Sequence, residues 1–98
     1  MSRVRFVAAA RREFLAEVAF YNEVEVGLGQ RFASAVEKTT ARALIFPLSG
    51  SPSNANTRRV VVSGFPFSVF YRPEKDDIVI FAIANHARQP GYWQMRVR

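Results

Sequence analysis

The sequence predicts a single α+β domain in which a helical hairpin packs on one face of a small, largely antiparallel sheet. The first half carries two stretches with apolar residues at three-to-four spacing, and the second half carries three short runs rich in β-branched and aromatic residues. A chain of 98 residues that is 49% hydrophobic can form one core but not two. The expected order is therefore β-α-α-β-β-β within one domain, residues 1–98.

Residues 3–7 are expected to form a short strand, because charged and apolar side chains alternate there. From about residue 9 the spacing of apolar residues becomes that of an amphipathic helix. Gly27 and Gly29 are expected to end this helix, because glycine tolerates the left-handed backbone that is common at helix C-termini. The predicted apolar stripe consists of Ala10, Phe14, Val18, Tyr21 and Val24 or Glu25.

A second stripe with the same spacing predicts another helix, which Pro47 should end. Because only one or two residues join the two helices, they should form an antiparallel hairpin. Residues 48–57 consist almost wholly of turn and loop formers and are expected to be an exposed, mobile connection. The stripe of the second helix consists of Leu28, Phe32, Ala35 or Val36, Thr39, Ala43 and Phe46.

Three strands are predicted in the second half, at residues 58–63, 67–72 and 78–84. Turn-forming residues separate them, which indicates an antiparallel meander. Residues 78–83 are apolar at every position, so this strand should lie in the middle of the sheet and be covered on both faces.

The charge of the chain indicates an anionic partner. Lysine and arginine number 14 against eight acidic residues, and all but Lys38 and Lys75 of the basic residues are arginine. Arginine's planar guanidinium suits phosphates and carboxylates, so a nucleic acid or an acidic protein is expected. Residues 58–98 hold seven basic and three acidic side chains, and the anion-binding surface is therefore expected there.

Several classes of protein are disfavoured by what the sequence lacks. Without cysteine there is no thiolate metal site or thiol nucleophile, and with one histidine we expect no metal and no cofactor. No glycine-rich phosphate loop follows any predicted strand, which disfavours nucleotide-binding enzymes. The apolar runs are too short to span a membrane, and no secretion signal is visible, so we expect a soluble, cytoplasmic protein.

The open face of the sheet is the expected place for a functional site. Arginines beside exposed aromatic rings suit phosphates and unstacked bases, and they also suit an acidic protein. A structural alternative stands beside this interpretation, since arginines can protect an edge strand and aromatic rings can close the end of a core. The candidate target- or nucleic-acid-binding residues are Arg58, Arg59, Arg72, Arg88, Trp93 and Arg96.

His86 is the one side chain with an ordinary pKa near neutrality, so it is the available general base or acid. RNA cleavage by 2′-hydroxyl attack needs two proton-transfer groups and a cation beside the phosphorane. If the chain is a nuclease, His86, Tyr92 and Arg88 are the candidates for these roles. A histidine at a strand end can equally be a hydrogen-bonded structural residue.

Two segments carry a family resemblance. Residues 65–72 read Phe-Pro-Phe-Ser-Val-Phe-Tyr-Arg, and residues 86–93 read His-Ala-Arg-Gln-Pro-Gly-Tyr-Trp. Together with the order of elements, the Pro47-x-x-Gly50 loop and the Arg58-Arg59 pair, they resemble the RelE/ParE superfamily of toxins, especially plasmid-stabilisation proteins. The resemblance covers nearly the whole chain. It implies a small cytoplasmic toxin of a type II toxin–antitoxin module, neutralised by a cognate antitoxin whose C-terminal segment wraps around it.

The superfamily implies two activities. RelE-like members cut mRNA on the ribosome, whereas ParE-like members inhibit DNA gyrase without hydrolysis. RelE-like cutters tend to carry lysines where this chain reads Val-Val-Val at residues 60–62 and an arginine where it has Ser68, while Arg88 and Tyr92 match their functional arginine and tyrosine. The reduced basic set favours gyrase inhibition. The alternatives are a ribosome-dependent mRNA endoribonuclease, which leaves open whether the chain is an enzyme, and an inactive binding module that retains the fold.

Overall fold

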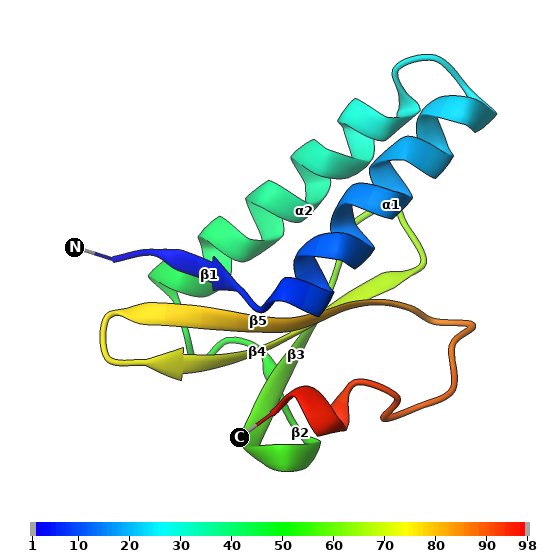
Figure 1. Cartoon of the computed structure of the whole chain (residues 1–98). Coiled ribbons are helices and arrows are strands. Elements are labelled where there is room, and N and C mark those ends of the chain that lie inside the picture. Colours follow the sequence, from blue (N-terminus) through cyan, green and yellow to red (C-terminus); the bar gives the residue numbers. More distant parts are fainter. Residues whose placement is uncertain (1, 98) are drawn as a thin grey trace.

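The computed structural model describes residues 2–97 and confirms the predicted α+β fold. The hairpin of α1 and α2 covers one face of the sheet, and the C-terminal segment crosses the other face (Figure 1). Between the helical hairpin and the three predicted strands, the structure adds one short strand. The elements are β1 (Val4–Phe6), α1 (Ala8–Val24), α2 (Leu28–Ile45), β2 (Ser51–Ser53), the 3-10 helix η1 (Asn54–Asn56), β3 (Thr57–Val61), β4 (Phe67–Glu74), β5 (Asp77–Asn85) and the 3-10 helix η2 (Gln94–Arg96).

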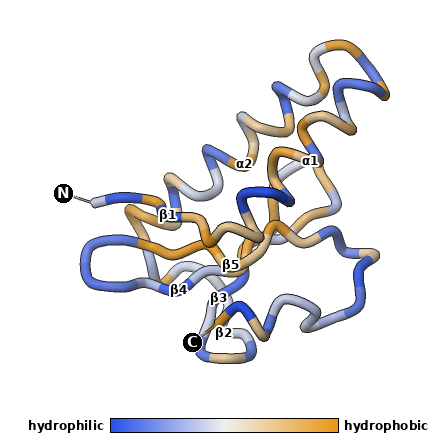
Figure 2. Tube along the Cα trace, viewed as in Figure 1, coloured by the Kyte–Doolittle hydropathy of each residue, from blue (hydrophilic) through white to orange (hydrophobic). Residues whose placement is uncertain are grey.

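The sheet has the strand order β1-β5-β4-β3-β2. The predicted meander is confirmed, since β3, β4 and β5 pair antiparallel, while β1 pairs parallel with β5. Strand β5 is therefore central, and every residue from Ile78 to Ala84 is buried, as the continuous apolar run predicted. Its hydrophobic character stands out against the hydrophilic β4–β5 turn in Figure 2.

Strand β5 contains one extra residue that changes which face of the sheet its side chains occupy. Its side chains pack in two hydrophobic cores, one on each face of the sheet. Phe70 of β4 pairs with Ala82, but the next residue, Tyr71, pairs with Ile80, so Phe81 has no partner opposite. A bulge of this kind shifts the alternation of side chains by one position. As a result Ile83 lies on the helix side with Ile80, and Phe81 lies on the opposite face of the sheet.

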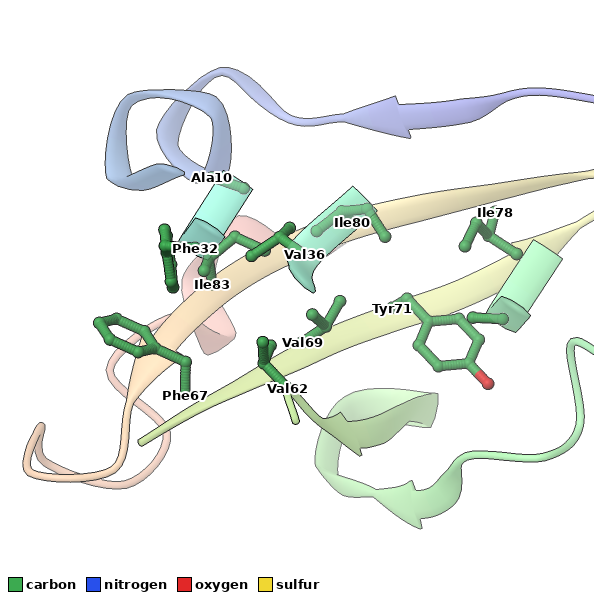
Figure 3. Close-up of a cluster of buried hydrophobic side chains, with 11 residues drawn as sticks. Ala10, Phe32, Val36, Val62, Phe67, Val69, Tyr71, Ile78, Ile80 and Ile83 are labelled. Atoms are coloured by element: carbon green, nitrogen blue, oxygen red, sulfur yellow. The ribbon is translucent and has the colours of Figure 1, made fainter. Parts of the chain in front are cut away.

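The main core lies between the helices and the sheet. Helix α1 contributes the predicted Ala10, Phe14, Val18 and Tyr21, and helix α2 contributes Phe32, at the end of the cluster that contains Phe67 (Figure 3). Because apolar residues three and four positions apart share a helix face, each helix buries one stripe. The fully enclosed members are Ala10, Phe32, Val36, Val62, Phe67, Val69, Tyr71, Ile78, Ile80 and Ile83.

Both predicted stripes end earlier than expected. Val24 is 60% exposed and Phe46 is 54% exposed, so neither belongs to the buried stripe of its helix. In α2 the buried threonine is Thr40 rather than Thr39. Among residues 2–97, neither helix combines the length and the apolar composition that crossing a membrane requires.

The predicted loop at residues 48–57 was partly wrong. Ser51–Ser53 pair antiparallel with β3 and form the outer edge strand β2, and η1 follows directly. Short polar edge strands are hard to recognise in sequence, because they lack an apolar face and their pairing depends on a distant partner.

The expectation that Gly29 ends the first helix was also wrong. Helix α1 ends at Val24, and Gly27, with φ of 86°, precedes α2. Gly29 lies in the first turn of α2, where its N–H donates to Asn22 Oδ1 at 2.8 Å. A Cβ here would stand 2.4 Å from the backbone oxygen of Val18. Glycine is therefore required because the two helices approach closely.

The substitution Gly29→Ala is expected to lower the free energy of unfolding by about 1–3 kcal/mol, because a backbone oxygen cannot move aside cheaply. The higher helix propensity of alanine, which is worth roughly 1 kcal/mol relative to glycine, acts in the opposite direction. Urea denaturation measures the change, with the exposed neighbouring substitution Gln30→Ala as control. Equal stability of Gly29→Ala and the wild type would show that the helices separate without cost.

Candidate functional site

A pocket of about 280 Å³ opens on the sheet face away from the helices. Strands β3, β4 and β5 form its floor, and the segment after β5 forms its wall. We call residues 86–97 the C-terminal strap. The pocket is lined by Ser53, Asn54, Arg59, Ser68, Phe70, Ala84, Asn85, His86, Arg88, Gln89, Pro90, Gly91, Tyr92 and Trp93.

Strand pairing brings the floor of the pocket together. Ser68 and Phe70 are two residues apart on β4 and therefore share a face. Arg59 of β3 pairs with Phe70, and Ala84 of β5 pairs with Ser68, so these side chains point to the same face. The same alternation sends Arg58 to the opposite side, where it pairs with the core residue Tyr71.

His86 is fixed at the end of β5. Its backbone N–H donates to the Pro66 carbonyl at 2.8 Å, and its Nε2 lies 2.8 Å from Ser68 Oγ. Ser68 is only 1% exposed, so the imidazole closes over the serine hydroxyl. Within residues 2–97, His86 forms no ion pair with a carboxylate. Such a carboxylate would be needed to orient the ring as in a three-residue catalytic system.

The aromatic residues of the strap lie against the sheet. Trp93 is 2% exposed, and its ring stacks on Phe70 with 4.4 Å between centroids. Tyr92 lies beside it, with the Arg88 guanidinium 3.9 Å from the centre of its ring. The structure thus gives Trp93 a packing role, and almost none of its ring is exposed to contact a target.

Glu13 of α1 holds the strap from the helix side. Its Oε1 accepts from Arg96 Nη1 at 2.8 Å and its Oε2 from Arg96 Nη2 at 3.0 Å. The Tyr92 hydroxyl also donates to Glu13 Oε2, and the Ile83 N–H donates to Oε1 at 3.2 Å. Arg96 additionally donates to the Phe81 carbonyl at 3.1 Å. One carboxylate thereby joins α1, β5 and the strap.

This arrangement changes the acidity of two groups near the pocket. Burial, and then the hydrogen bond to Glu13, raise the pKa of Tyr92 well above its ordinary value. Its hydroxyl therefore stays protonated near neutral pH. Burial and the neighbouring Glu13 raise the pKa of Glu17, while Arg88 opposes that rise.

Three of the candidate arginines bind backbone oxygens or a carboxylate within the fold. Arg58 donates to the Leu48 and Gly50 carbonyls at 3.1 and 2.8 Å and fixes the chain between α2 and β2. Arg72 donates to the carbonyls of η1 and lies 5.4 Å from the centre of the Phe81 ring. Arg96 binds Glu13 as described.

Arg59 and Arg88 differ from these three. Both are exposed and line the pocket, and neither forms an ion pair with the part of the chain that the structure describes. The pocket therefore presents two guanidinium groups beside the His86 ring and several amides. Such a donor set is chemically suited to an anionic group, because each guanidinium can donate two parallel hydrogen bonds to a carboxylate or phosphate.

Glu13 is not among the site residues that the sequence predicted. It precedes the stripe residue Phe14 and its side chain is only 15% exposed. A signal was present: no basic residue lies three or four positions away to pair with it, and it adjoins the apolar Phe14. Asn54 and Ser53 were missed because the loop that contains them was treated as mobile. Among residues 2–97, no three His, Asp or Glu side chains gather to bind a metal.

Comparison with known proteins places this geometry in a family. A sequence model of the ParE toxin of type II toxin–antitoxin systems, parDE, matches residues 4–90. The chain belongs to the ParE toxin family. Among solved structures, a chain of a chromosomal ParDE toxin–antitoxin system from P. aeruginosa shares the fold with a TM-score of 0.72 and 18% identity. The match covers 87% of this ParE-family chain and 96% of that chain. A search of curated protein sequences found no match.

Proposed function

We propose that this ParE-family protein is a cytoplasmic toxin that inhibits DNA gyrase and is neutralised by a cognate antitoxin. The proposal is supported by which polar side chains of the pocket already have hydrogen-bond or ion-pair partners. Arg59 and Arg88 point to the pocket without ion-pair partners among the described residues, whereas His86 and Tyr92 bind Ser68 and Glu13. A pocket of this kind favours binding of an anionic surface over proton transfer.

The proposal is tested with purified gyrase and relaxed plasmid DNA. We expect the purified chain to inhibit supercoiling in a dose-dependent manner, and increasing salt should weaken the inhibition, because exposed ion pairs are screened. The Arg88→Ala variant is the matched comparison and should require a higher concentration. Full supercoiling at every concentration of a folded chain would contradict gyrase as the target.

We also propose that the antitoxin is acidic where it crosses Arg59 and Arg88 and apolar where it lies on the helical hairpin. Exposed apolar side chains of the hairpin, including Leu15 and Phe20, support the second half. The affinity of the complex should fall as salt rises. An affinity that is independent of salt would contradict the proposal that acidic residues of the antitoxin bind Arg59 and Arg88.

A ribosome-dependent endoribonuclease is the second candidate, because one pocket contains His86, Arg88 and Tyr92. Two features disfavour it. The Tyr92 hydroxyl is bound to Glu13 with a raised pKa, and the cation beside it, Arg88, stacks on the tyrosine ring. Proton transfer from Tyr92 to a leaving oxygen would first require that hydroxyl to leave Glu13.

The substitution His86→Ala distinguishes the two functions. We expect growth arrest to persist, within about threefold of the wild-type toxicity at equal expression, because inhibition of gyrase by binding requires no proton transfer from His86. Growth curves after induction measure this, and primer extension on a reporter mRNA measures cleavage in the same cells. Loss of toxicity together with loss of mRNA cleavage would replace the gyrase proposal by the nuclease.

A further inference from the structure

The C-terminal strap is attached to the fold almost entirely by side chains. Backbone N–H groups along the strap donate to carbonyls only three residues earlier in the chain, so these bonds do not tie it to the sheet. The exceptions are the first two positions, where His86 donates to the Pro66 carbonyl and Ala87 donates to the side-chain oxygen of Asn85. The local donors are Arg88, Tyr92, Gln94, Arg96 and Val97.

Two sets of side-chain contacts hold the strap, in addition to the His86–Ser68 hydrogen bond at its start and the bond from Arg96 to the Phe81 carbonyl. Trp93 stacks on Phe70 over the second core, whose other members include Phe81. Glu13 accepts three hydrogen bonds from the strap, two from Arg96 and one from Tyr92. The carboxylate and the guanidinium are largely shielded, at 15% and 22% side-chain exposure, so solvent weakens this pair less than a surface pair.

We propose that Glu13 is a positioning residue: it latches the strap against α1 and thereby fixes Arg88 at the mouth of the pocket. The link is the Tyr92 ring, which Glu13 holds through the hydroxyl and on which the Arg88 guanidinium rests at 3.9 Å. This inference rests on the proposed function in one respect, namely that Arg88 contacts the target. The latch itself can be measured without any target.

Trp93 reports on the latch, because it is the only tryptophan in the chain and is the strap residue that is buried against the sheet. In Glu13→Gln, loss of the charged hydrogen bonds is expected to raise the fraction of released strap about tenfold or more. Trp93 emission should then shift to longer wavelength and acrylamide quenching should increase, while circular dichroism still shows the native helices and sheet. Glu25→Gln is the matched control, since the one ion pair of Glu25 within residues 2–97 is with the exposed Arg31.

Arg96→Ala combined with Tyr92→Phe removes all three strap hydrogen bonds to Glu13 and leaves α1 unchanged, so this double variant decides the question if Glu13→Gln fails to fold. Increased quenching of Trp93 in either folded variant supports the latch. Quenching equal to the wild type in the folded Arg96→Ala, Tyr92→Phe variant would overturn it, because the strap would then be held without any hydrogen bond to Glu13.

A double-mutant cycle tests whether Glu13 acts through Arg88. We expect Glu13→Gln to weaken gyrase inhibition by roughly tenfold, and to have no further effect when Arg88 is already alanine. Additive losses would overturn the positioning role, because a purely structural effect does not depend on Arg88. If the wild-type chain leaves gyrase unaffected, the proposed function fails, and the quenching of Trp93 alone decides the latch.

Discussion

The substitution Phe32→Ala is expected to lower the free energy of unfolding by about 3–5 kcal/mol, a large share of the roughly 5–15 kcal/mol typical of a small domain. Phe32 is fully buried, and its ring lies 5.0 Å from Phe67 and 5.1 Å from both Tyr21 and Phe65, measured between centroids. Alanine would leave a cavity that helix α1, β4 and the turn after β3 all border. Urea denaturation at a fixed temperature measures the loss.

Phe20→Ala is the matched control, because Phe20 is on the same hairpin but is 54% exposed and contacts only the Tyr21 ring among the aromatic residues described. Phe20→Ala should lower the free energy of unfolding by no more than about 1 kcal/mol. Comparable losses at the two positions would mean that the hairpin does not pack on the sheet as described.

Removing both pocket arginines, Arg59→Ala with Arg88→Ala, is expected to reduce toxicity more than any other exposed change. Each arginine that binds an anionic group contributes about 1.5–3 kcal/mol, so the pair should weaken target binding by roughly a hundredfold or more. Both side chains are exposed and carry no ion pair within residues 2–97, so stability should change little. Growth after induction and thermal unfolding are measured together.

The control removes two exposed arginines from the helices, Arg12→Ala with Arg42→Ala, and keeps the net charge equal to that of the pocket variant. This control should remain toxic. If both pairs reduce toxicity equally, overall positive charge rather than the pocket determines binding.

The fold could be predicted from the sequence wherever the spacing of apolar residues was long and regular. The stripe from Ala10 to Tyr21 and the apolar run that begins at Ile78 marked a helix and a central strand, and the structure has both. Gly29 was misassigned because glycine indicates either a helix end or a close approach, and only the neighbouring Val18 oxygen distinguishes the two. Strand β2 depends on pairing with β3, which no local pattern records.

The sequence predicted which segment contains the site, but it did not predict how the side chains are arranged there. His86, Arg88 and Tyr92 were selected by residue type, and the structure places all three at one pocket. Sequence could not separate Arg58 from Arg59, because which of two neighbours faces the pocket depends on the register with β4. Nor could it pair Glu13 with Arg96, which lies 83 positions away.

Inducing the chain alone and pulse-labelling DNA and protein synthesis over the first minutes tests whether the toxin acts on gyrase through its anion-binding pocket. If gyrase is the target, DNA synthesis falls first and the Arg59→Ala, Arg88→Ala double variant delays that fall. An earlier fall in protein synthesis would contradict it in favour of the ribosome, and no change in either with a folded chain would identify an inactive binding module.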